Sequence, residues 1–109
     1  MKYKNTLQKG SVRFIIFREG DVWYGTCLEF NIVESGDAPQ EAMLLLFEAV
    51  EGYLESARRI KARSRILNQR PEHEYETMWN DLQERKKVHA KDVFTFGNLN
   101  IAKRALVPA

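Results

Sequence analysis

The sequence contains little that would support a fold held by disulfides or metal ions. Cys27 is the only cysteine, which excludes an intramolecular disulfide and is typical of a reducing compartment. The two histidines, His73 and His89, lie sixteen residues apart, and no cysteine pair accompanies either of them. Because a zinc site needs closer spacing or more ligands, we predict no metal and no cofactor.

Long apolar runs and a strong charge imbalance are missing too. No window approaches the roughly 20 apolar residues of a membrane-spanning helix, and the N-terminus lacks the apolar stretch of a signal peptide. We therefore expect a cytoplasmic protein without a membrane partner. The net charge of +2 is too small to indicate nucleic-acid binding by itself. The 109 residues, 44% of them hydrophobic, suit a single domain over residues 1–109.

Short runs rich in β-branched and aromatic residues predict strands. Residues 12–17 (VRFIIF) and 22–30 (VWYGTCLEF) are separated by a glycine-containing turn, which is typical of a hairpin. Residues 32–35 (IVES) predict a third strand and residues 91–99 (KDVFTFGNL) a fourth. The tail at 101–109 has no clear pattern.

A long amphipathic helix follows the corner at residues 34–42 (ESGDAPQEA), and its apolar positions repeat with the helical period as far as Ala57. Pro39 suits the first helical position, which would place Ala38 at the N-cap. Because alanine is a poor N-cap residue, Asp37 is the alternative cap. Gly36 is expected to supply a positive φ. A phosphate-binding loop is disfavoured, because further glycines and a Lys-Ser or Lys-Thr pair are missing.

The apolar arc of this helix, about 200° wide, exceeds what one sheet face needs and predicts a second contact surface. Leu44 falls among the acidic residues opposite the arc, and Met43 and Phe47 lie at its edge. Trp23 is of a type that anchors interfaces, although a core position is the alternative. The predicted partner or oligomer interface consists of Trp23, Met43, Leu44, Phe47, Glu48, Glu51 and Glu55.

A basic segment, residues 58–65 (RRIKARSR), is expected to continue the helix for some turns. It offers a possible contact for nucleic acid or an acidic partner, and a solvated helix face is the alternative. No aromatic residue interrupts the segment, so stacking on single-stranded bases is not predicted. Its basic residues are Arg58, Arg59, Lys61, Arg63 and Arg65.

Pro71 predicts the start of a second, weaker amphipathic helix. The element order is therefore β-β-β-α-α-β. We predict the α+β class, with a three- to four-stranded, mainly antiparallel sheet and one long helix packed on it.

The acidic residues near the strands do not predict a metal-dependent nuclease. Asp21 is expected in a hairpin turn and Asp37 at a helix start, so convergence on two metal ions is not indicated. Cys27 has no neighbouring base of the kind that a nucleophile needs. We predict a binding module without catalytic residues and rank a divalent-metal nuclease last.

Residues 14 to about 58 resemble the HicB family of antitoxins. The matching pieces are WYGTCLE at 23–29, SGD at 35–37, QEA at 40–42, EAV at 48–50 and YLE at 53–55. The resemblance implies a truncated ribonuclease-H-like fold without catalytic acids, with a HicB-like core at about 11–58. Residues 59–109 would then add the basic extension, the second helix and the C-terminal strand, and they show no recognisable DNA-binding domain.

The resemblance also implies a function and a partner. HicB-like antitoxins of type II toxin–antitoxin systems cover HicA, a small mRNA-cleaving toxin with a catalytic histidine. The acidic helix face would suit such a basic, RNA-binding partner. We therefore predict a bacterial, non-catalytic antitoxin that acts by protein–protein occlusion and forms a homodimer or larger homo-oligomer. The alternatives are a nucleic-acid-binding regulator that uses the basic segment and a solitary HicB-like domain without a toxin partner.

Overall fold

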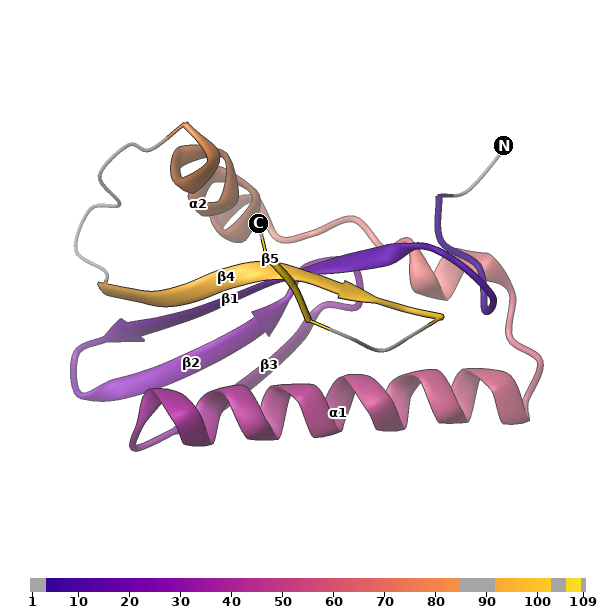
Figure 1. The fold of residues 1–109 in the computed structure, drawn as a ribbon, viewed down its shortest axis with the longest axis horizontal. Helices are drawn as coiled ribbons and strands as arrows, with labels where there is room; N and C mark the ends of the chain where they lie inside the picture. Colours follow the sequence, from indigo (N-terminus) through magenta and orange to yellow (C-terminus); the bar gives the residue numbers. More distant parts are fainter. Residues whose placement is uncertain (1–3, 85–91, 103–105, 109) are drawn as a thin grey trace.

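The computed structural model describes residues 4–84 and 92–102 in full and residues 106–108 by their backbone. Its elements are β1 (Ser11–Glu19), β2 (Val22–Cys27), β3 (Ile32–Gly36), α1 (Pro39–Arg59), a 3-10 turn η1 (Ser64–Leu67), α2 (His73–Gln83), β4 (Asp92–Asn100) and β5 (Leu106–Pro108) (Figure 1). The predicted order of strands and helices is confirmed. The tail adds β5, a short strand whose pattern was not evident.

The strands form one antiparallel sheet in the order β3-β2-β1-β4-β5, so the expected three or four strands are five. The helix α1 lies over β3 and β2 on one face. On the opposite face, α2 packs against residues of β1 and β4. The two helices therefore cover opposite halves of the sheet. In the described chain, no helix covers β4 on the face of the sheet that packs against α1, and none covers β3 on the face that packs against α2.

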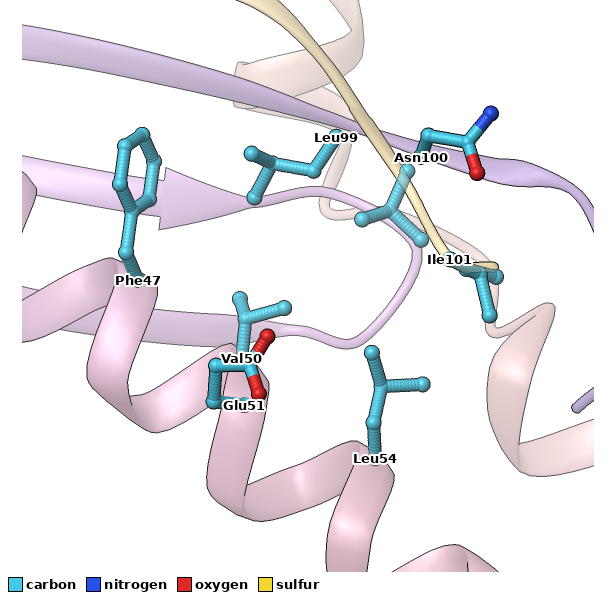
Figure 2. A pocket seen from close by; sticks show the side chains of 8 residues that line it. Phe47, Val50, Glu51, Leu54, Leu99, Asn100 and Ile101 are labelled. Atoms are coloured by element: carbon cyan, nitrogen blue, oxygen red, sulfur yellow. The ribbon is translucent and has the colours of Figure 1, made fainter. Parts of the chain in front are cut away.

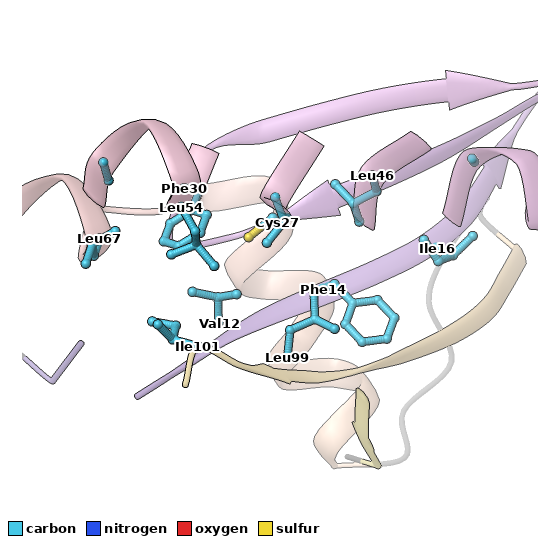
Figure 3. Close-up of a cluster of buried hydrophobic side chains, with 13 residues drawn as sticks. Val12, Phe14, Ile16, Cys27, Phe30, Leu46, Leu54, Leu67, Leu99 and Ile101 are labelled. Atoms are coloured by element: carbon cyan, nitrogen blue, oxygen red, sulfur yellow. The ribbon is translucent and has the colours of Figure 1, made fainter. Parts of the chain in front are cut away.

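The central strand β1 supplies both core layers. Val12, Phe14 and Ile16 point to the α1 side, where they pack with Leu46 and other apolar residues of the helix (Figure 3). Ile15 and Phe17 alternate with them and pack with α2. Because both faces of β1 are covered, the sequence FIIF is apolar without interruption instead of alternating with polar residues.

The corner before α1 differs from the prediction in two respects. Ala38 is the N-cap and Pro39 the first helical residue, as expected. Gly36, however, is not among the described glycines with positive φ, which are Gly10 and Gly20. A Cβ at position 36 would instead lie 2.6 Å from Oε1 of Glu41. That carboxylate accepts a hydrogen bond from the backbone N–H of Asp37 at 2.8 Å, so Glu41 caps the corner and the Asp37 side chain does not.

A pair of glycine substitutions tests whether Gly36 is needed because the Glu41 side chain lies so close to it. We expect Gly36→Ala to lower the free energy of unfolding by about 1–2 kcal/mol, because the methyl group displaces Glu41 and breaks its capping bond. Gly52→Ala is the control, since a Cβ there meets open space in the middle of α1. It should stabilise the protein by about 0.5–1 kcal/mol. Chemical denaturation measures both changes, and equal signs for the two variants would contradict the assignment.

The predicted boundaries also need correction. α1 stops at Arg59 and does not continue through the basic segment. The N–H of Ala62 bonds to the carbonyl of Ala57 and the N–H of Lys61 to that of Arg58, while Lys61 has φ 51. These are the bonds of a Schellman motif, with lysine where glycine is usual. The chain therefore turns away from the helix axis at this point.

Two further boundaries shift by a few residues. α2 begins at His73, with Glu72 as its N-cap, two residues after the predicted start at Pro71. β2 ends at Cys27, and residues 28–31 form a turn that Asn31 closes with φ 52. Within the described chain, no helix combines the length and the apolar character that crossing a membrane requires.

Candidate interaction surface

A groove runs along α1 where the helix leaves the β4 half of the sheet uncovered. Phe47, Val50 and Leu54 face it from the helix, and Leu99 and Ile101 face it from β4 and the residue after it (Figure 2). Its volume is about 210 Å³. The remaining lining residues are Val12, Glu51 and Asn100. The lining is therefore mainly apolar with a few polar groups, the composition expected of a recognition groove.

Aromatic residues occupy the same sheet face near the β1–β2 hairpin. The ring centroids of Trp23 and Phe94 are 6.2 Å apart in an edge-to-face arrangement. The guanidinium of Arg18 lies over the Trp23 ring, with its Cζ 5.5 Å from the centroid, and forms an ion pair with Asp92. Phe94 is 45% exposed, whereas Trp23 is half-buried against the α1-side core. Of these two aromatic residues, Phe94 is therefore the one available to a partner.

Phe94 was not predicted as an interface residue because a β-bulge determines its position. β4 pairs Thr95 with Ile16 and Val93 with Phe17, so Phe94 is the extra residue between them. Strict alternation would place Phe94 and Phe96 on one face. Instead Phe96 packs against Trp79 of α2 on the opposite face. The run VFTFG contains aromatic residues but no signal for the bulge.

The predicted interface residues divide into three groups. Phe47 and Glu51 line the groove, and the Phe47 ring packs edge-on against Phe14 with centroids 5.2 Å apart. Met43 and Trp23 are half-buried and belong mainly to the core on this face. The three exposed members on the outer side of α1 are Leu44, Glu48 and Glu55.

The basic segment is no single helical face. Arg58 and Arg59 lie in the last turn of α1, where Arg59 pairs with Glu55 at 3.6 Å. The Nη1 of Arg58 is buried, and no described atom forms a hydrogen bond with it. Lys61, Arg63 and Arg65 follow on the loop and in η1, and all three side chains are exposed. The predicted basic residues therefore lie together at one end of the molecule but on different backbone elements.

The potentially reactive side chains occupy structural positions. Cys27 is fully buried in the α1-side core, and burial raises the pKa of its thiol far above its ordinary value, so the thiolate is not available at neutral pH. His73 is exposed at the start of α2, and His89 lies outside the described residues. Among the residues that the structure describes, no three His, Cys, Asp or Glu side chains are grouped as a metal site.

Comparison with known proteins adds no relative: no family model, no curated protein and no solved structure matches this chain.

Proposed function

We propose that this chain is a non-catalytic, HicB-like antitoxin with a truncated ribonuclease-H-like fold. In this proposal it works in the bacterial cytoplasm and neutralises a HicA-type, mRNA-cleaving toxin by covering the toxin's RNA-binding surface. The observation that carries the proposal is the apolar groove beside α1 together with the acidic residues of that helix. Glu51 lines the groove, and Glu48 and Glu55 lie on the outer side of α1.

The proposed mechanism divides binding between charge and apolar burial. A toxin that cleaves mRNA must present cations to phosphate groups, and the acidic side of α1 attracts those cations. Apolar side chains of the toxin then fill the groove between Phe47 and Leu99 and exclude water from it. Because the toxin uses the same cations for RNA and for the antitoxin, the two ligands compete. Occlusion of this kind requires no catalytic residue from the antitoxin.

The proposal includes self-association. Leu44 is 59% exposed on the outer side of α1 and is one of the large apolar side chains that the described chain leaves exposed. We assign it to contact between copies of this chain, which form a homodimer or a larger homo-oligomer. Leu44 is not a lining residue of the groove. Because Glu48 and Glu55 lie on the same outer side of α1, self-association through Leu44 and toxin binding use neighbouring parts of this helix.

Charge reversal on α1 tests the toxin-binding proposal. With a purified HicA-type toxin as partner, we expect Glu48→Lys/Glu55→Lys to raise the Kd by about 100-fold, because like charges then face each other. Titration calorimetry with the purified partner measures the Kd, and co-expression measures rescue of growth from its toxicity.

The matched control for this experiment is Glu19→Lys/Asp21→Lys. It makes the same change in net charge at the β1–β2 hairpin, where both residues are exposed. Its Kd should change by less than about threefold, the effect of net charge alone. If the wild-type chain neither binds nor rescues, the toxin-binding proposal fails and the solitary HicB-like domain becomes the better description. If both variants weaken binding equally, α1 is not the contact surface.

A further inference from the structure

The charges of this chain are strongly separated along the sequence. Residues 56–71 contain six basic residues and no acidic residue. Since the net charge of the whole chain is +2, the rest carries a net charge of −4. The end of α1, η1 and the start of the following connection bring these residues to one end of the molecule (Figure 1). The molecule therefore has a basic end although its net charge is small.

The N-terminal segment lies beside this basic end. Asn5 is buried, its backbone N–H bonds to Oδ1 of Asn68, and its Nδ2 bonds to the carbonyl of Leu67, both at 2.9 Å. Lys4 precedes Asn5, and Lys9 follows in the same turn, and both side chains are exposed. Residues more than sixty positions apart thus add to one basic surface.

An open depression of about 470 Å³ lies between η1 and the turn after β2. Of the described residues that line it, only Ile66 is apolar, and the others carry amide or guanidinium groups: Asn31, Arg65, Asn68, Gln69 and Arg70. A protein partner normally buries apolar anchors at the centre of its interface, whereas nucleic-acid interfaces are polar and positively charged. The amide and guanidinium side chains of this depression match the second kind.

The amide groups of the depression are already engaged in holding its walls. Asn68 Nδ2 donates to the carbonyls of Asn5 and Ser64 at 2.9 and 2.8 Å. Asn31 Nδ2 donates to Gln69 Oε1 and to the carbonyl of Arg70, both at 3.2 Å. These bonds fix the backbone on both sides of the depression.

Gln69 and the α1 helix complete this frame. The Tyr53 hydroxyl donates to the carbonyl of Ile66 at 2.6 Å, and Gln69 Nε2 donates to the Tyr53 oxygen at 2.7 Å. The Tyr53 ring stacks on Phe30 with centroids 4.5 Å apart. Arg65 and Arg70 thus stand on a backbone that side chains from several elements hold in place. Preorganised support of this kind reduces the entropy cost of ligand binding.

We propose that this basic end binds the phosphodiester backbone of a nucleic acid, with Arg65 and Arg70 as the central phosphate contacts. Both side chains are exposed, and within the described chain neither forms an ion pair. The planar guanidinium group binds phosphate oxygens in a bidentate manner. Among the described residues, no aromatic side chain lines the depression, so bases do not stack there. Phosphate contacts carry no sequence information, so recognition is independent of sequence. This surface is separate from the groove, and the proposal does not rest on toxin binding.

Fluorescence anisotropy of the full chain with labelled single-stranded RNA of about 16 nucleotides, and with DNA of the same sequence, tests the proposal. We expect a Kd of about 10⁻⁶–10⁻⁴ M at physiological salt, with log Kd rising linearly with log salt concentration. Arg65→Gln/Arg70→Gln should reduce the salt slope by about 1.4, the value for two contacts to a single strand, and weaken binding about tenfold or more at low salt. Thermal denaturation confirms that this variant is folded.

Arg18→Gln is the control, because it removes a cation near the β1–β2 hairpin, at the other end of β1 from the basic end. It should leave the slope within about 0.5 of the wild-type value. Equal affinity for RNA and DNA would support recognition of the backbone alone, and tighter binding of RNA would add a contact to the 2′-hydroxyl. No binding at low salt, an equal loss of slope in Arg18→Gln, or equally effective competition by polyglutamate at the same charge concentration would overturn the proposal.

Discussion

Leu46→Ala will lower the free energy of unfolding by about 3–4 kcal/mol, whereas Leu44→Ala, two residues earlier in the same helix, will change it by less than about 0.5 kcal/mol. Leu46 is 0% exposed and Leu44 is 59% exposed. The position that a Cβ of Gly25 would take lies only 3.1 Å from the Leu46 Cβ. Because glycine has no side chain that can move into the cavity, truncation of Leu46 leaves a void that the sheet cannot fill.

Denaturation at a protein concentration low enough for the chain to be monomeric measures both changes, since self-association makes stability depend on concentration. The same two positions separate folding from assembly. Leu44→Glu should leave the far-UV circular dichroism spectrum unchanged but reduce the mass in solution, as measured by light scattering, towards that of a monomer. If Leu44→Glu leaves both the mass and the affinity for a partner at their wild-type values, the assignment of Leu44 to an interface is wrong.

The helical period of α1 was predictable because a single physical cause determines it. Ala42, Leu46, Val50 and Leu54 repeat at the spacing that places side chains on one face, and all four are buried. The exposed position of Leu44 follows from the same spacing, since it lies on the opposite side of the helix. Pro39 marks the start of the helix because proline lacks the N–H that the first turn does not need.

Features that depend on pairing between distant segments were not predictable. The bulge that exposes Phe94 arises from the register between β1 and β4, which are separated by the whole of α1 and α2. The groove exists because α1 lies to one side of the sheet, and no residue of the helix alone indicates that displacement. The depression beside Arg65 joins the N-terminal segment, α1 and the turn after β2, so only the folded chain brings its walls together.

Arg13 is the clearest example of a structural role hidden in a sequence. Its Nε donates to Glu29 at 2.6 Å, and its two terminal nitrogens donate to the carboxylate of Glu76 in α2 at 2.6 and 3.0 Å. The guanidinium also lies over the ring of Trp79, 5.6 Å from its centroid. The two carboxylates are sixteen and sixty-three positions away in sequence. One side chain thus ties α2 to the sheet and to the turn after β2.

Arg13→Met should therefore lower the free energy of unfolding by about 2 kcal/mol at neutral pH. Loss of one partner from a fully buried ion pair costs about 3–5 kcal/mol. The value here is smaller because the side chains involved remain 18–36% exposed and water screens them. Arg18→Met is the matched control on the same strand. Its ion pair with Asp92 is 47% and 63% exposed, so we expect a loss of less than about 1 kcal/mol.

The pH dependence of stability distinguishes this ion network from simple packing of the Arg13 side chain. Hydrogen bonds from Arg13 hold the pKa of Glu76 below its ordinary value of 4.5. A carboxyl group with a lowered pKa in the folded state stabilises the protein above the pKa of the unfolded chain, and this contribution is lost as the pH falls through the lowered value. Wild type should therefore lose more stability than Arg13→Met between about pH 7 and about pH 3. Parallel stability curves for the two proteins would show that Arg13 acts through packing on Trp79 and not through its charge.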